Sequence, residues 1–167
     1  MNWQEIGVNV VGKEGKDGYV FEGIVGWDLP NRDSQGLTVP LYRYYQPKVN
    51  DYFFTTNGAE VGTTTQGETG KFGYISEGIA CYVYRGKVQF DTLITQPLYR
   101  YFEEKSSDHL YTRDATEVGT TTLGELGKNN YRSEGIVGWI FATDFAAPLP
   151  VPTVPTILGK SPKSGCA

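Results

Sequence analysis

One short phrase occurs three times along this chain, and this internal repeat restricts the possible folds more than any other feature. The phrase reads "YVFEGIVGW" at residues 19–27, "YISEGIACY" at 74–82 and "YRSEGIVGW" at 131–139. Its glutamates, Glu22, Glu77 and Glu134, are separated by 55 and 57 residues. A repeat of this period indicates copies of one supersecondary unit that pack on one another.

Other motifs return with the same spacing and divide each unit into two halves. "VPLYRYYQPKVNDYFFTT" at 39–56 returns as "QPLYRYFEEKSSDHLYTR" at 96–113, and these first halves share L-Y-R-Y-[YF] and D-x-[FL]-[FY]-T. The second halves contain E-[IV]-G, at 5–7, 60–62 and 117–119, followed by Y-x-x-E-G-I. The chain therefore has three second halves but only two first halves. We divide it into one repeat domain at 1–145, with half-unit 1 (1–29), unit 2 (38–84) and unit 3 (95–141), and a proline-rich tail at 146–167.

Both halves have the residue pattern of β-strands. In "LYRYY" the side chains alternate, with Leu41, Arg43 and Tyr45 on one face and Tyr42 and Tyr44 on the other. Before each E-[IV]-G motif the sequence allows one helical turn, but the Gly and Thr residues that follow oppose a longer helix. We expect an all-β fold of four short antiparallel strands per unit in a three-bladed, propeller-like ring, with a β-trefoil as the alternative.

The two full units, "LYRYY…NDYFFTT…GYISEGIACYVY" and "LYRYF…SDHLYTR…NYRSEGIVGWIF", resemble a widespread repeat of uncharacterised function. Its usual form is L-Y-R-[LY]-[YW]-N-P, then D-H-F-Y-T and G-Y-x-x-E-G-[IV], and the resemblance covers residues 2–142. Such repeats are appendages of bacterial surface and wall-degrading proteins and stand alone in animal and fungal proteins. The resemblance implies an extracellular or cell-surface binding or adhesion module, although no secretion signal is visible in this chain. The chain departs from the pattern at Tyr52, where the family has the histidine that is retained as His109.

Composition excludes several classes of function. The net charge of −4 argues against a protein that binds nucleic acid. No apolar run approaches the length of a membrane span. The two cysteines, Cys81 in a strand-like segment and Cys166 in the tail, are not expected to form a disulfide. The sequence has neither a metal-binding cluster of Cys and His nor a phosphate-binding glycine motif, so we expect no metal and no cofactor.

Catalysis has little support in the sequence. His109 is the only histidine, and its counterpart in unit 2 is Tyr52, which favours a packing or hydrogen-bonding role at this position over that of a catalytic base. A glycosidase that uses Glu22, Glu77 or Glu134 is weakened by the repeat, because such an enzyme needs two carboxylates in different environments rather than three equivalent ones. We therefore expect a protein that is not an enzyme.

The repeated arginines and glutamates are expected to form ion pairs. A half-buried carboxylate needs a partner, and a guanidinium offers two donors at once. Pairing within each unit gives Arg43–Glu77 and Arg100–Glu134, which we favour. Pairing across units gives Arg43–Glu22 and Arg100–Glu77. In one interpretation these pairs only hold the fold together, and in the other they line a sugar-binding pocket.

Two functions remain open from the sequence. The first is a non-catalytic, lectin-like module with weak repeated sites for glycans or a cell-surface polysaccharide, because sugars bind to aromatic faces flanked by polar groups. The second is a structural or adhesion protein whose repeat only builds a stable aromatic core. Trp27, Tyr82 and Trp139 occupy equivalent positions and are expected to pack in the core unless one is exposed. The candidate ligand-binding residues are Tyr42, Arg43, Tyr44, Asp51, Glu77, Tyr99, Arg100, Tyr101, Asp108, His109, Glu134 and Trp139.

The missing first half of unit 1 leads to a prediction about the tail. A ring of complete units closes by strand pairing, so a unit that lacks strands leaves a sheet edge open to other segments. The tail contains "TVPTIL" at 153–158, which is similar to "TVPLYR" at 38–43. We expect residues 153–158 to lie against unit 1, or against the open edge of a second molecule in a homodimer. The alternative is an unstructured tail.

Overall fold

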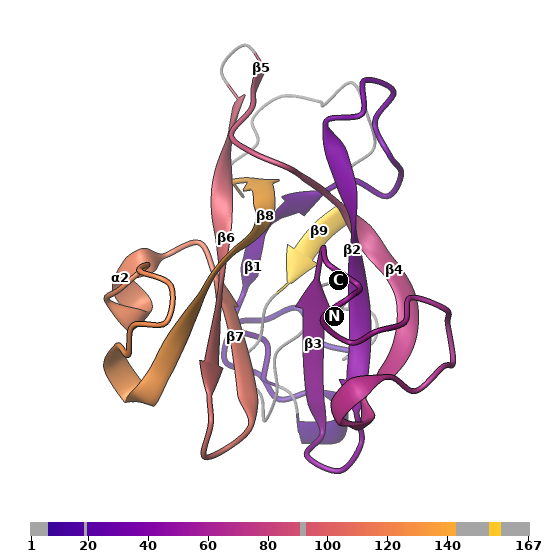
Figure 1. Cartoon of the computed structure of the whole chain (residues 1–167). Coiled ribbons are helices and arrows are strands. Elements are labelled where there is room, and N and C mark those ends of the chain that lie inside the picture. Colours follow the sequence, from indigo (N-terminus) through magenta and orange to yellow (C-terminus); the bar gives the residue numbers. More distant parts are fainter. Residues whose placement is uncertain (1–6, 19, 91–92, 143–153, 158–167) are drawn as a thin grey trace.

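The computed structural model describes residues 7–18, 20–90, 93–142 and 154–157. The described elements are mainly antiparallel strands, and the all-β prediction is confirmed (Figure 1). Among the described residues, no helix has the length and apolar character needed to cross a membrane. The strands are β1 (Ile24–Asp28), β2 (Thr38–Gln46), β3 (Asp51–Thr55), β4 (Ile75–Tyr84), β5 (Gln89–Phe90), β6 (Leu93–Glu103), β7 (Asp108–Thr112), β8 (Tyr131–Phe141) and β9 (Val154–Ile157). The short helices are η1 (Lys16–Gly18), η2 (Lys71–Gly73), α2 (Ala115–Val118) and η3 (Lys128–Asn130).

Units 2 and 3 form the same three-stranded arrangement. In unit 2, β2 lies between β3 and β4, and in unit 3, β6 lies between β7 and β8. The registers correspond residue by residue, since Arg43 is opposite Gly78 and Arg100 is opposite Gly135. The prediction of four strands per unit was wrong, because the segments on either side of Gly78 form the single strand β4. Gly78 itself has a φ of 86°, which a residue without a Cβ adopts readily, so the strand continues through it.

The predicted helical turn before E-[IV]-G is present in unit 3. It is α2, whose first turn is capped by the Asp114 side chain, which accepts a hydrogen bond from the backbone nitrogen of Thr116. The helix ends at Gly119, which has left-handed backbone angles, and it therefore spans only one turn.

The three copies of the repeated phrase meet in a closed cycle of backbone pairs. Each copy of the phrase ends in an aromatic residue. That residue pairs with the residue that lies two positions after the end of another copy. The pairs are Trp27–Phe141, Trp139–Tyr84 and Tyr82–Leu29. Their side chains join one hydrophobic cluster, in which the three aromatics that end the phrases are partly buried. A propeller or trefoil arrangement goes beyond these pairs and stays a prediction.

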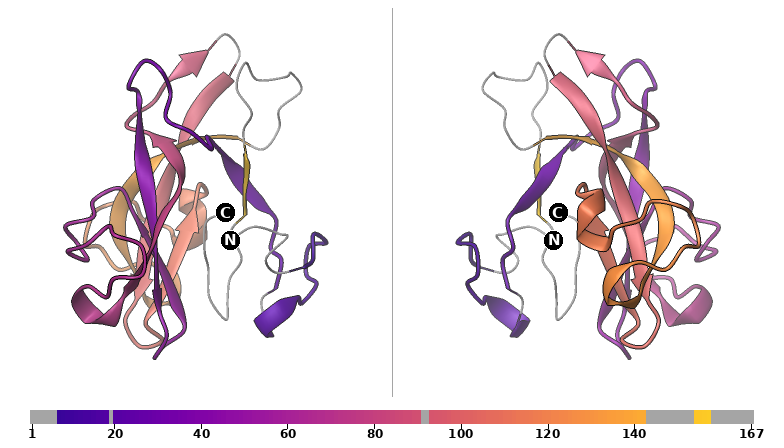
Figure 2. Two further views of the ribbon diagram at one scale, coloured as in Figure 1. Left: turned by 90° about the vertical axis from the view of Figure 1, so that its right-hand side faces the viewer. Right: turned by 90° about the vertical axis from the view of Figure 1, so that its left-hand side faces the viewer.

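The tail supplies a strand to unit 1. β9 pairs with β1 in antiparallel register, and the two strands run side by side (Figure 2). Pro155 is opposite Trp27, just as Pro40 is opposite Tyr82 in unit 2 and Pro97 is opposite Trp139 in unit 3. Each pairing also has a register shift at the corresponding position. β9 therefore takes the place in unit 1 that β2 and β6 hold in their own units, which confirms the tail prediction for its four described residues. Pairing with a second molecule stays a prediction.

Besides the cluster at the cycle of strand pairs, the described buried side chains form a central core and two outer clusters. The central core includes Leu41, Phe54 and Cys81 of unit 2, and Leu98, Tyr111 and Ile140 from β6, β7 and β8, so it joins the two full units. Cys81 is buried, whereas Cys166 lies outside the described residues. The outer clusters are equivalent, one around Tyr44 and Val61 and the other around Tyr101 and Val118. These clusters hold the E-V-G turns against the sheets and so position Glu60 near unit 3.

Candidate binding site between two repeat units

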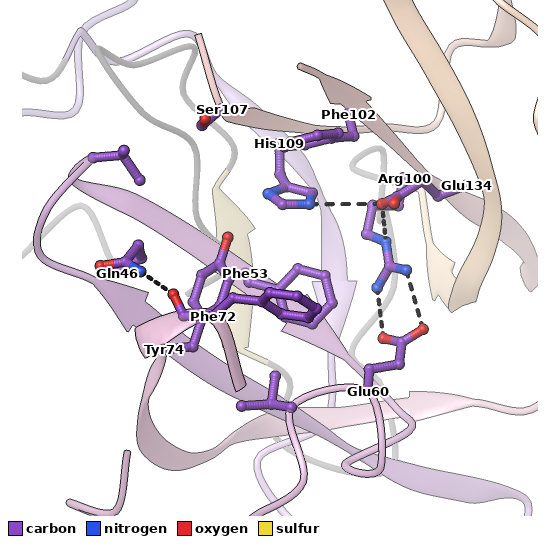
Figure 3. Close-up of a pocket in the computed structure, with 12 residues that line it drawn as sticks. Gln46, Phe53, Glu60, Phe72, Tyr74, Arg100, Phe102, Ser107, His109 and Glu134 are labelled. Carbon is purple, nitrogen blue, oxygen red and sulfur yellow. Dashed lines mark hydrogen bonds and ion pairs between the residues drawn. The ribbon is translucent and has the colours of Figure 1, made fainter. Parts of the chain in front are cut away.

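A pocket of about 560 Å³ lies where unit 2 meets unit 3 (Figure 3). Unit 2 contributes residues from the end of β2, the β2–β3 turn, β3, the E-V-G turn, η2 and the residue that follows η2. Unit 3 contributes residues from β6, the β6–β7 turn, β7 and β8. The lining residues are Gln46, Val49, Phe53, Glu60, Val61, Phe72, Tyr74, Arg100, Phe102, Ser107, His109 and Glu134. The site therefore needs two neighbouring full units, and each provides different positions of the repeat.

Arg100 is the central charged group of the pocket. It is only 7 % exposed, and its two terminal nitrogens donate hydrogen bonds of 3.1 and 3.2 Å to the carboxylate of Glu60. Its Nε lies 2.6 Å from a carboxylate oxygen of Glu134 in an ion pair. A third contact is a 3.2 Å hydrogen bond from Nη1 to the carbonyl oxygen of Phe54. One guanidinium thus connects the E-V-G turn and β3 of unit 2 with β8 of its own unit.

The within-unit ion pairs predicted from the sequence are confirmed. The Arg100–Glu134 pair has its counterpart in unit 2, where Arg43 Nε lies 2.5 Å from a carboxylate oxygen of Glu77. The pairs occur because each arginine is opposite the glycine that follows the glutamate. The cross-unit contact from Arg100 goes to Glu60 of the E-V-G motif, a partner that the sequence analysis did not consider.

His109 lies at the boundary between the units and faces two carboxylates. Its Nδ1 is 2.8 Å from an Oδ atom of Asp51 in unit 2, and its Nε2 is 3.7 Å from Glu134 in its own unit. Asp51 is fully buried and also accepts a 2.5 Å hydrogen bond from the hydroxyl of Tyr74. An ionised carboxylate only accepts, so it pairs with the His109 tautomer that carries its hydrogen on Nδ1, and Nε2 faces Glu134.

The electrostatic environment of the pocket keeps the carboxylate of Glu60 ionised. Burial alone would raise the pKa of Glu60, but the hydrogen bonds and charge of Arg100 outweigh it and hold that pKa below its ordinary value. The pKa of Arg100 is raised: burial acts against the charge, while Tyr111, Glu60 and Glu134 favour it. Burial and the negative charge of Asp51 raise the pKa of the Tyr74 phenol, which therefore stays protonated.

Aromatic rings form the apolar wall of the pocket. The Phe53 ring centroid lies 4.6 Å from the guanidinium carbon of Arg100, within the range of a cation–π contact. The same ring makes an edge contact with His109 at 5.0 Å and a tilted contact with Tyr74 at 5.4 Å. Phe102 packs on the other side of His109 at 4.7 Å. The rings thus fix the polar groups in place.

The structure brings only some of the sequence-predicted site residues into this pocket. Arg100, His109 and Glu134 line it, and Asp51 lies directly behind His109. Tyr44 and Tyr101 are fully buried in the outer clusters, with their hydroxyls donating to backbone carbonyls at 2.7 and 2.8 Å. The other predicted residues do not line it: Tyr42 and Tyr99 pack against the outer clusters, Arg43 and Glu77 pair with each other, Asp108 accepts from Tyr131, and Trp139 packs near the cycle of strand pairs.

Several pocket residues were missed by the sequence analysis. Glu60 belongs to the repeated E-V-G motif, and Tyr74 begins the repeated Y-x-x-E-G-I motif, so the repeat itself contained a signal for both. Gln46 and Phe72 carry no such signal, because unit 3 has Glu103 and Asn129 at the equivalent positions. Within the described residues no group of three or more His, Cys, Asp or Glu side chains could hold a metal ion.

Comparison with known proteins identifies a family for this repeat domain. The family model DUF5648, described as a domain of unknown function, matches residues 8–141, which is more than half of the chain. The chain belongs to this family. The matched DUF5648 region contains units 2 and 3, residues 8–29 of half-unit 1 and every residue of the pocket. No curated protein and no solved structure shows a significant match to the chain.

Proposed function

We propose that this chain is a non-catalytic carbohydrate-binding module and that the pocket between units 2 and 3 is its binding site. The observation that carries the proposal is the combination of an aromatic wall with fixed hydrogen-bonding groups in one pocket of about 560 Å³. This volume lies within the range of roughly 300–1,000 Å³ that is typical of small-molecule sites. A sugar ring places its C–H face on an aromatic ring and its hydroxyls on charged or amide groups.

The same groups are poorly suited to catalysis. A glycosidase needs one carboxylic acid with a raised pKa, whereas the pKa of Glu60 is lowered and Glu134 is held in an ion pair with Arg100. His109 is enclosed by Phe53 and Phe102 and has its Nδ1 occupied by Asp51. We expect these residues to bind and orient a ligand and not to transfer protons.

The resemblance of the motifs to surface-protein repeats supports an extracellular or cell-surface location. The closed cycle of pairs among β1, β4 and β8 supports a propeller-like ring of three units around that point. Affinity for one sugar is expected to be weak, and several copies of the module on a surface would gain avidity toward clustered glycans.

Glycan binding by the whole chain tests this function. The chain is applied to an array of surface-immobilised glycans that includes bacterial wall polysaccharides, and positive glycans are measured again as soluble oligosaccharides. We expect binding to clustered glycans that the Glu60→Gln variant weakens. Its matched control is Glu117→Gln, which changes the equivalent glutamate of unit 3, an exposed residue outside the pocket. Equal loss in both variants, or no binding to any glycan, would contradict the proposal.

The second candidate is a structural or adhesion protein whose repeat only builds a stable core. It is favoured by Tyr44 and Tyr101, two repeat-equivalent residues that are fully buried and make the same hydrogen bond. Absence of binding across the array would favour this candidate.

A further inference from the structure

Phe72 of η2 is an unusually exposed aromatic residue at the pocket. It is 80 % exposed, the highest value among the large hydrophobic residues that the structure describes. It lines the pocket together with Gln46, Phe53 and Tyr74, all from unit 2 (Figure 3). A phenylalanine exposed to this extent gains little from burial, so packing does not explain its position.

The backbone at Phe72 is strained. Its φ of 58° and ψ of 12° lie in the left-handed region, which bulky residues rarely adopt. The equivalent residue of unit 3, Asn129, has a φ of 54° and belongs to a residue type that tolerates this region. Unit 1 has Asp17 at the corresponding position of the sequence. Unit 2 therefore places an aromatic side chain at a position where the other units have short polar residues.

A contact specific to unit 2 holds this strained segment in place. The side-chain amide of Gln46 donates a hydrogen bond to the carbonyl oxygen of Phe72. Gly73 allows this approach, because a Cβ there would lie 2.8 Å from the amide nitrogen of Gln46. In unit 3 the residue equivalent to Gln46 is Glu103, whose carboxylate instead accepts from the backbone nitrogens of Lys105 and Ser106. The two units thus differ at both ends of this contact.

We propose that Phe72 is a stacking platform at the mouth of the pocket for the apolar face of a non-acidic sugar ring. This inference rests on the proposed function of the pocket. Stacking requires an accessible aromatic face beside hydrogen-bonding groups, and Phe72 provides that face at a pocket whose lining also includes Glu60, Ser107 and Glu134. The charge of the pocket selects against acidic sugars, because Arg100 is neutralised by two carboxylates and the fully buried Asp51 lies behind His109.

The variant Phe72→Asn, which installs the residue of unit 3, separates binding from folding. We expect its melting temperature to equal or exceed that of the wild type, because asparagine tolerates the left-handed backbone. We expect its affinity for a neutral or amino oligosaccharide found on the array to fall about tenfold, and that of Phe72→Trp to be retained. Uronic-acid and sialic-acid oligosaccharides should bind more weakly than neutral ones to the wild-type chain.

The control is Leu123→Asn, which removes an equally exposed apolar side chain, 74 % exposed, that lies outside the pocket. Its affinity should match the wild type. If Phe72→Asn binds as tightly as the wild type while Glu60→Gln does not, the pocket binds sugar and the role of Phe72 is wrong. Preference for acidic sugars would overturn the ligand class. If the wild-type chain binds no sugar, the proposed function and this inference both fail.

Discussion

The phenol oxygen of Tyr111 lies 2.7 Å from the backbone nitrogen of Phe54 and 3.2 Å from the carbonyl oxygen of the same residue. The two residues occupy equivalent positions in units 3 and 2, and both are buried. One hydroxyl therefore accepts from the Phe54 N–H and donates to its C=O, which joins β3 to β7 across the unit boundary. Burial raises the pKa of Tyr111 well above its ordinary value, so the phenol keeps the proton that it donates.

Removal of this hydroxyl is expected to weaken the contact between the units. Tyr111→Phe leaves the buried N–H of Phe54 without that acceptor, and we expect a loss of about 1–3 kcal/mol in the free energy of unfolding. The control is Tyr101→Phe, which removes one part-buried hydrogen bond to Thr120 and should cost about 1 kcal/mol. Denaturant unfolding measures both. A smaller loss for Tyr111→Phe than for the control would contradict the role of this hydroxyl.

Arg100→Ala is expected to destabilise the fold far more than the same change in unit 2. The Arg100 side chain is 9 % exposed and has charged partners on both sides of the unit boundary, so its removal leaves Glu134 and Glu60 without this cation. We expect a loss of about 3–5 kcal/mol. Arg43→Ala is the matched control, because the Arg43 side chain is 23 % exposed and solvent screens its pair with Glu77. Thermal melts that show equal losses for the two variants would exclude a special role for Arg100.

Acid is expected to weaken the loop that leads into β2. The carboxylate of Asp33 accepts hydrogen bonds from the backbone nitrogens of Leu37 and Thr38 and from the Thr38 hydroxyl. Burial opposes ionisation, but these bonds together outweigh it and lower the pKa of Asp33 from 3.8 to about 2. Because the folded-state pKa is depressed, the stabilisation is present above pH 3.8 and is lost as the pH falls toward about 2.

Asp33→Asn tests this pH dependence. At neutral pH we expect the variant to lose roughly 1 kcal/mol of stability, a value kept small by exposure of the loop to solvent. The difference from the wild type should shrink below pH 3.8. Denaturant unfolding over this pH range measures it, and a difference that does not change with pH would show that the charge of Asp33 is not responsible.

Deletion of residues 150–167 is expected to lower the melting temperature, because it removes β9 and uncovers the edge of β1. A second variant, Thr156→Pro, keeps the length of the tail and removes a backbone donor opposite Gly26. Melts and sedimentation of both variants are the measurements. If the truncated chain melts at the wild-type temperature and sediments as a particle of the same shape, the pairing of β9 adds no stability.

The site could be predicted from the sequence only where it reuses the repeat. The Arg100–Glu134 pair follows from motif spacing, since the same spacing in unit 2 produces the pair of Arg43 with Glu77. The contacts to Glu60 and Asp51 could not be predicted this way, because they cross the boundary between units. Tyr44 and Tyr101 were predicted to bind ligand but are buried away from the pocket. Each is next to an arginine in sequence and therefore points to the other face of the strand.

The sequence by itself determined the all-β class, the within-unit ion pairs and the strand that the tail contributes, because all of these depend on local pattern and on self-similarity. Only the tertiary structure decided which repeated positions differ in role. His109 and Tyr52 are equivalent in the repeat, yet only His109 lines the pocket. His109 belongs to unit 3 and lies at the boundary where that unit meets unit 2. The physical reason is that a site between two units takes different repeat positions from each, and a pattern within one unit does not contain that asymmetry.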